Sequence, residues 1–182
     1  MNKDRFFAIF WQLIKYTFLA GGLALIIRGF LLIPVPIEGN SMEGTLKQND
    51  MVVMEKISKV KRFDVIVFES ADGKTYVKRV IGMPGDSVSY KDDTLYINDI
   101  KVEEPFLERN LIADQDETIP FTYDFDFEEL MGVKKLGKNS YFVMGDNRRV
   151  SKDSRSFGAI TTDNIIGKAR FVYYPLKNIH FI

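Results

Sequence analysis

The feature that most constrains the fold of this chain is an uncharged apolar run near its N-terminus. Residues 16–27 carry no charge, and residues 30–33 continue the run after a single arginine. A helix needs about 20 residues to cross the hydrocarbon core of a bilayer, so Lys15 and Arg28 would lie near its two edges. The sequence therefore predicts one transmembrane anchor over residues 16–34.

The charges around this run predict how the chain is oriented. Lys3, Arg5 and Lys15 precede the apolar core, whereas only Arg28 follows it closely. Basic residues collect on the cytoplasmic side of a span. We therefore expect a single-pass protein of the cell membrane, with residues 1–15 as a cytoplasmic tail and residues 35–182 outside the cytoplasm.

Two other interpretations of the apolar run stay open at this point. A cleavable signal peptide would need small residues just before its cleavage site, and Pro34-Val35-Pro36-Ile37-Glu38 does not supply them. A buried core helix of a soluble protein is the second alternative. A retained anchor fits the length of the run best.

Beyond Pro36 the pattern changes to short alternating runs separated by turns. Turn-forming residues such as Ala71-Asp72-Gly73 and Met83-Pro84-Gly85-Asp86 separate these runs. The predicted strands cover residues 51–57, 64–69, 76–81, 87–90, 95–98, 141–144 and 165–174. Closely spaced strands with little helix predict a mainly β domain of antiparallel sheets. Residues 105–138 fit this pattern least well, with one helical turn near 127–131.

The composition excludes several classes of function. Positive and negative residues balance at 25 each, so no overall field attracts nucleic acid. The chain has no cysteine, which excludes thiol catalysis, and one histidine, His180, two residues from the C-terminus. A hydroxyl nucleophile would therefore need another base, and a lysine made neutral by burial can serve.

Ser41 and Lys78 are the candidates for such a pair. Gly39-Asn40 before Ser41 can adopt positive φ and present the hydroxyl and its N–H at a sharp bend, where an N–H can stabilise an oxyanion. Strand alternation places Tyr76, Lys78 and Val80 on one face. Desolvation among such neighbours would lower the pKa of Lys78 from about 10.4. An ordinary loop serine and a surface lysine remain the alternatives for each residue taken alone.

A third polar segment follows the strand predicted at 141–144. Residues 145–158 contain Asp146, Ser151, Asp153 and Arg155 within a short distance of one another. A solvated loop is one interpretation. A hydrogen-bonded network that holds a neighbouring site rigid is the other.

In order and spacing these segments resemble type I signal peptidases, which are membrane-anchored Ser–Lys endopeptidases. The matching motifs are Ser41-Met42-Glu43-Gly44-Thr45-Leu46, residues 62–68, residues 76–86 and residues 145–155. The resemblance covers nearly the whole chain except about residues 108–138, and the short length is typical of the single-span form of Gram-positive bacteria. It implies a barrel-like antiparallel-sheet catalytic domain, of a type shared with self-cleaving repressors.

The resemblance also implies a role for each matching residue. Ser41 would be the nucleophile, Lys78 the general base, and no metal or cofactor would be needed. Gly39, Ser151, Asp153, Arg155, Arg79 and Asp146 would support the oxyanion or the base, and Ser151 would do so by a hydrogen bond that orients the Lys78 amine. Met42, Leu46, Tyr76 and Val77 would line shallow pockets for small side chains at positions −1 and −3 of the substrate. The implied partners are the signal peptides of secretory preproteins and the lipid bilayer.

Two positions depart from the family pattern. Gly44 stands where the family usually has proline, and a glycine there predicts a looser turn beside Ser41. Gly39 stands where many members have a serine that assists the oxyanion, which leaves the Ser41 N–H as the main donor.

Three rival functions remain. A catalytically weak or silent relative would bind exported peptides at the membrane without cutting them. A self-cleaving repressor shares the Ser–Lys chemistry, but it has no membrane span. Residues 132–139 approach a phosphate-binding loop, but Asn139 stands where that motif needs Ser or Thr, and a strand follows where it needs a helix.

Overall fold

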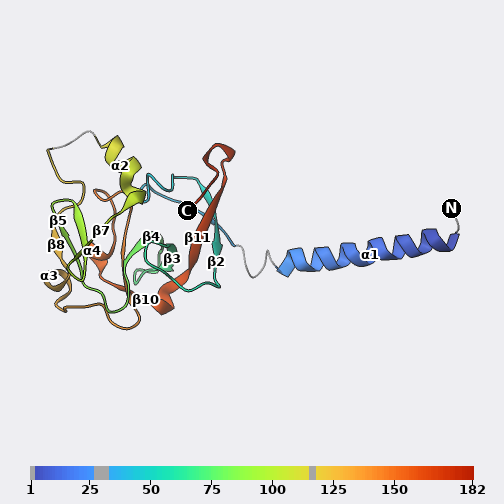
Figure 1. Ribbon diagram of the computed structural model, residues 1–182, viewed down its shortest axis with the longest axis horizontal. Helices are drawn as coiled ribbons and strands as arrows, with labels where there is room; N and C mark the ends of the chain where they lie inside the picture. Colours follow the sequence, from blue (N-terminus) through green and yellow to red (C-terminus); the bar gives the residue numbers. More distant parts are fainter. Residues whose placement is uncertain (1–2, 27–32, 115–117) are drawn as a thin grey trace. The chain divides into compact units, whose positions relative to one another are not determined.

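The computed structural model describes residues 3–26, 33–114 and 118–182 of the protein (Figure 1). Contacts divide the chain into two units, with the boundary between Ile33 and Pro34. The predicted positions of Arg28 and of residues 30–32 lie outside the described residues.

The first unit contains one long helix, α1 (Lys3–Ile26). It begins well before residue 16, where the sequence analysis placed the start of the anchor, so Lys15 lies inside the helix. The stretch Phe7–Leu25, 19 residues, is long and apolar enough to cross a bilayer. Large apolar side chains along it are exposed, including Phe7, Trp11, Phe18, Leu19 and Leu25. A helix with exposed apolar residues of this kind has the character of a membrane span rather than of a core helix.

The second unit is built mainly from two antiparallel sheets. The larger sheet has the order β1-β2-β11-β3-β4-β9-β10, with β12 pairing β11. Its strands are β1 (Ile33–Pro36), β2 (Met51–Glu55), β3 (Val65–Glu69), β4 (Thr75–Gly82), β9 (Ser140–Met144), β10 (Ile160–Thr161), β11 (Ile165–Tyr174) and β12 (His180–Phe181). The order is an open path, so the barrel-like sheet does not close on itself.

The smaller sheet has the order β7-β6-β5-β8. Its strands are β5 (Val88–Lys91), β6 (Thr94–Ile97), β7 (Ile100–Val102) and β8 (Phe125–Asp126). The remaining short elements are η2 (Pro105–Leu107), α2 (Glu108–Ala113), α3 (Phe127–Met131), α4 (Ser154–Phe157), η3 (Thr162–Asn164) and η4 (Leu176–Asn178).

The sequence located the longer strands and the helical turn near 127–131, which is α3. Asp126 begins α3 by accepting hydrogen bonds from the backbone N–H groups of Glu128 and Glu129, and Gly132 ends it with φ of 69°. The prediction for residues 105–138 was incomplete, because this segment also holds η2, α2 and β8.

One hydrophobic cluster of the second unit lies beneath the segment that carries Ser41. Met42 and Leu46, on either side of a tight turn, are 2% and 0% exposed. They pack with buried side chains of the large sheet and its connections, which are Ile37, Val52, Val65, Ala169 and Val172. Burying two such side chains contributes several kcal/mol, at about 1.5–3 kcal/mol each, which fixes the turn against the sheet.

Candidate active site

Ser41 lies in a turn that leaves β1 and is closed by its own backbone. Glu43 N donates to Asn40 O (3.1 Å), and Leu46 N donates to Met42 O (2.8 Å). Gly39 enters the turn with φ of 82°, which only glycine adopts without strain. Met42 points into the core while Ser41 is half-buried. The turn therefore holds Ser41 on a rigid base with its hydroxyl accessible.

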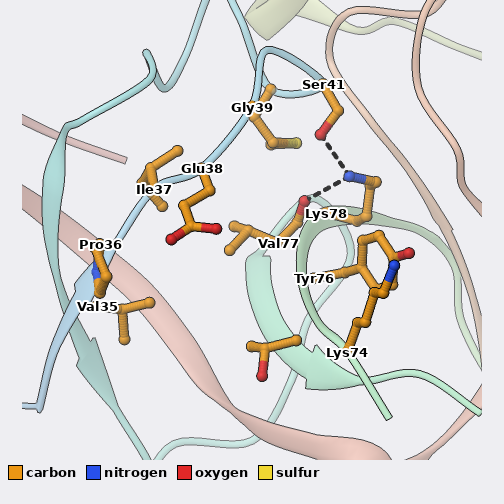
Figure 2. Close-up of a pocket in the computed structure, with 12 residues that line it drawn as sticks. Val35, Pro36, Ile37, Glu38, Gly39, Ser41, Lys74, Tyr76, Val77 and Lys78 are labelled. Carbon is orange, nitrogen blue, oxygen red and sulfur yellow. Dashed lines mark hydrogen bonds between the residues drawn. The ribbon is translucent and has the colours of Figure 1, made fainter. Parts of the chain in front are cut away.

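Lys78 reaches Ser41 from the adjacent part of the large sheet. It lies on β4, is 2% exposed, and its Nζ is 2.6 Å from Ser41 Oγ (Figure 2). The amine also donates to Val77 O at 3.0 Å. Ile66 of β3 pairs with Lys78 of β4, and this register fixes the position of the lysine along the strand. A nucleophilic hydroxyl and an amine base are therefore in direct hydrogen-bond contact.

Burial changes the ionisation of Lys78. Desolvation lowers the pKa of its amine from 10.5 to about 8, although the carboxylates of Asp153 and Asp146 oppose this by favouring the charged form. Near neutral pH a useful fraction of the amine is then unprotonated and can accept the hydroxyl proton of Ser41.

A groove of about 590 Å³ runs past the pair (Figure 2). Two strand segments line it, Val35 to Gly39 on one side and Lys74 to Lys78 on the other. β1 is the edge strand of the large sheet, and β9 pairs with β4 only from Arg79 onward. Both walls therefore present open strand edges, and an extended peptide can pair with such edges as an added strand.

The groove contains most of the residues predicted to bind substrate. Met42, Tyr76 and Val77 line it. Leu46 is not among its lining residues, because it is fully buried in the cluster beneath the turn. Leu46 instead packs in the core under the turn and so helps to hold Ser41 in place.

Asp146 and Arg79 connect the turn that carries Ser41 to β4. Its side chain is fully buried and accepts from Arg79 Nε (2.8 Å), from Arg79 Nη2 (2.6 Å) and from Thr45 Oγ1 (2.5 Å). Arg79 Nη1 in turn donates to Phe63 O (2.8 Å), and its guanidinium lies 4.0 Å from the centre of the Phe106 ring. A buried charge pair with every partner satisfied ties the turn to β4.

Asp153, which is buried, and Arg155, which is partly exposed, form a second ion pair nearby. Asp153 accepts from Arg155 Nε (2.9 Å) and Nη2 (2.8 Å), and also from Gly145 N (3.0 Å). A Cβ at Gly145 would lie 2.2 Å from Ser151 Oγ and 2.4 Å from Ser41 O. Asp153 therefore fixes a backbone position that packs directly against Ser41.

Ser151 is close to the site without being bonded to Lys78. Its Oγ is buried and makes no hydrogen bond with the residues that the structure describes. The predicted contact from this hydroxyl to the lysine amine is thus not formed here. The Ser41 N–H likewise has no hydrogen-bond partner within the described parts of the chain, so it is free to bind an oxyanion.

The structure also adds residues that the sequence analysis did not single out. Thr45 bonds to Asp146, and the Asn147 N–H donates to Ser41 O (3.0 Å). Asn110, from α2, donates to the backbone of the turn beside Gly44. Gly44 has φ of 100°, which makes the turn a left-handed bend at this position, and the looseness that a glycine predicts here stays a prediction. Thr45 and Asn147 lie inside the recognised motifs, whereas no sequence signal marked Asn110.

Comparisons with known proteins agree on one family. The family model for signal peptidase, peptidase S26, matches residues 10–174. A signal peptidase I of Bacillus caldolyticus is 40% identical over 162 residues, which is 85% of this chain and 86% of the relative. A signal peptidase IB of Staphylococcus aureus is 40% identical over 164 residues, which is 86% of this chain and 85% of the relative.

A solved structure gives the same result. The crystal structure of a signal peptidase I from Enterococcus faecalis is 39% identical and superposes with a TM-score of 0.58, covering 62% of this chain and 98% of that one. Together with the apolar helix α1, these matches make the chain a membrane-anchored protein. The chain belongs to the signal peptidase I family of S26 peptidases, serine endopeptidases that remove signal peptides.

Proposed function

We propose that Ser41 is the nucleophile and Lys78 the general base of this peptidase. The observation that carries the proposal is the 2.6 Å contact between Ser41 Oγ and the buried Lys78 Nζ. A lysine in a dry environment, with its pKa lowered to about 8, meets the requirement for a base active near neutrality.

Acylation begins when neutral Lys78 accepts the Ser41 proton. Ser41 Oγ bonds to the scissile carbonyl carbon, and the carbonyl electron pair moves to oxygen, where the free Ser41 N–H can stabilise it. When this intermediate collapses, the carbon–nitrogen bond breaks and the Lys78 ammonium protonates the leaving amine. The mature protein departs, and the signal peptide remains as an ester of Ser41.

Deacylation uses the same base again. Water gives a proton to the now neutral Lys78 as its oxygen attacks the ester carbonyl. Collapse then releases the signal peptide as a carboxylic acid, which loses its proton to solvent, while the Lys78 ammonium returns its proton to Ser41 Oγ. No metal or cofactor takes part in either step.

The substrate binds as an added strand between β1 and the open half of β4. Met42, Tyr76 and Val77 face the side chains of the bound segment, and their bulk favours small residues at positions −1 and −3. Gly39 and Ser41 border the oxyanion position. Asp146 with Arg79, and Asp153 with Arg155, keep the turn and its neighbours rigid, and Ser151 orients the Lys78 amine once substrate excludes water.

The anchor places this chemistry beside its substrates. The N-terminal tail is cytoplasmic and residues 35–182 act outside the cytoplasm, where the apolar segment of a signal peptide lies in the same bilayer. That shared location raises the effective substrate concentration without any new contact. The partners are signal peptides and lipid, and nucleic acid is not one of them.

Cleavage of a model preprotein by the detergent-solubilised full chain tests the catalytic assignment. We expect Ser41→Ala and Lys78→Met each to lose roughly 10³-fold or more in turnover. Ser156→Ala and Lys91→Met are matched controls at exposed positions, and both should cleave normally. Cleavage that survives at neutral pH in Lys78→Met contradicts the role of Lys78, and wild type that binds without cleaving indicates a silent relative.

Labelling in intact cells tests the orientation. Because the chain has no cysteine, a single introduced cysteine is the one thiol of this protein with which a maleimide can react. An impermeant maleimide should react with Lys91→Cys and not with Arg5→Cys. The reverse result overturns the proposed topology.

A further inference from the structure

The side-chain amide of Asn110 joins the two backbone segments that bracket Ser41. Its Nδ2 donates to Glu43 O (2.7 Å), in the turn that carries the serine, and to Asp146 O (2.6 Å), in the segment after β9. An amide NH₂ has two protons, and both are used by these carbonyls. The side-chain orientation is therefore fixed, since the opposite orientation would set oxygen against oxygen.

Gly44 provides the space that this contact requires. A Cβ built at Gly44 would lie 1.6 Å from Asn110 Oδ1, 2.4 Å from Cγ and 2.8 Å from Nδ2. These are the three nearest heavy atoms, and all belong to the terminal amide of Asn110. Gly44 also has φ of 100°, a conformation that side chains disfavour. Any side chain at position 44 would thus displace Asn110 from at least one of its carbonyl partners.

The contact adds to hydrogen bonds that already tie the turn to other segments of the chain. Asn147 N donates to Ser41 O (3.0 Å), and Thr45 Oγ1 donates to Asp146 Oδ2 (2.5 Å). Both of these reach the turn from residues 146–147. Asn110 comes from α2, so its two bonds clamp Glu43 and Asp146 together from outside. The direction of Ser41 Oγ toward Lys78 depends on how rigidly this turn is held.

We propose that Asn110 is a positioning residue for Ser41 and that Gly44 is its obligatory structural partner, so that α2 controls the geometry of the nucleophile. The kinetic part of this proposal rests on the proposed role of Ser41. Asn110 touches neither Lys78 nor the groove wall, so it acts on turnover through the turn and not on substrate binding.

Steady-state kinetics of the full chain on a preprotein test the positioning role. We expect Asn110→Ala to lower kcat roughly tenfold with KM changed less than about twofold, because small misplacements of a reacting group are costly. The pH at which activity reaches half its maximum should not move, because Asn110 does not contact Lys78. Asn110→Asp keeps the shape but cannot donate when ionised, and it should lose at least as much.

Leu111→Ala, at the next residue of α2 and half-exposed, is the matched control and should leave kcat unchanged. A general loosening of α2 would lower kcat in Leu111→Ala as well, and that result overturns the proposal. So does an Asn110→Ala loss that falls on KM, or a kcat within twofold of wild type in both Asn110 variants.

A double-mutant cycle tests the partnership with Gly44. Gly44→Ala should lower the melting temperature more in the wild-type background than in the Asn110→Ala background, because Asn110→Ala removes all three atoms that a new Cβ would meet. Additive effects overturn the partnership. The melting temperature can be measured without any catalysis. A chain that does not cleave would therefore refute the proposed function, and the melting temperatures would still decide whether Asn110 and Gly44 are coupled.

Discussion

Replacing Lys78 by methionine should abolish cleavage and at the same time stabilise the fold at neutral pH. The fall in the pKa of Lys78 from 10.5 to about 8 means that the folded state disfavours the protonated amine. At about 1.4 kcal/mol per pKa unit, this fall corresponds to a destabilisation of about 3 kcal/mol at pH 7. Methionine has a similar volume and no charge. It loses the hydrogen bonds to Val77 O and to Ser41 Oγ, at about 1 kcal/mol each, so the expected net gain is about 1 kcal/mol.

The gain should depend on pH in one direction. Between about pH 8 and pH 10.5 the unfolded lysine binds more protons than the folded one, so the wild-type free energy of unfolding rises with pH through this window. The advantage of Lys78→Met is therefore complete below pH 8, shrinks as the pH rises and is reversed by about pH 10.5, where the wild type is the more stable protein.

Urea unfolding of the full chain in detergent, followed by tyrosine fluorescence, measures these differences, since the single tryptophan, Trp11, lies in α1. Lys168→Met is the matched control, because Lys168 is equally buried but pairs with Asp64 (3.0 Å). Removing it takes away the shorter of the two ion pairs of Asp64, whose other partner is Arg170 (3.7 Å), and should destabilise the fold. If Lys78→Met is no more stable than wild type at pH 7, or if its advantage does not change with pH, burial does not neutralise Lys78.

Three further results are expected from the same geometry. Turnover of the wild type should rise with pH along a limb centred near 8, as the folded Lys78 loses its proton, and a limb centred near 10 would contradict desolvation. Asp153→Asn should move this limb to lower pH, since the Asp153 carboxylate raises the pKa of Lys78; a shift to higher pH would show that another group dominates. Gly145→Ala should reduce turnover about 10²-fold or more because its Cβ would meet Ser41 O at 2.4 Å. Gly39→Ala, where a Cβ meets nothing within 4 Å, should cost only about 1 kcal/mol of backbone strain. Equal losses of turnover in the two glycine variants would contradict the packing argument.

The sequence predicted the parts of the fold that carry a repeating pattern. Alternation located the longer strands, such as β4 and β11, because each has one face on the core. Two-residue strands such as β10 have no pattern of their own and exist because a partner strand lies at the right register. The start of α1 carries no signal in the sequence, because polar residues in its first turns interrupt the apolar run without ending the helix.

The residues of the site also fall into those that the sequence could predict and those that it could not. Ser41 and Lys78 could be paired from sequence because each carries a chemically demanding group in a distinctive local context. Asn110 could not be found, because its two acceptors lie 67 and 36 residues away and only the tertiary fold brings them together. Its segment also falls in the part of the chain that the family resemblance did not cover. Leu46 shows the opposite error, since a residue within a recognised motif supports the core rather than the groove.

Some features that catalysis at Ser41 requires lower the stability of the fold, and hydrogen-bonded ion pairs beside the serine offset this loss. A buried amine costs stability, and the unpaired strand edges on both walls of the groove contribute none. The compensating contacts, from Asp146 to Arg79 and from Asp153 to Arg155, have buried carboxylates and several hydrogen bonds each. They hold the backbone on both sides of the serine, and among the residues that the structure describes its hydroxyl bonds only to Lys78. Substrate, when it adds a strand to both walls, satisfies the edges that folding left open. Part of the binding energy therefore comes from strand groups that the free enzyme exposes to water.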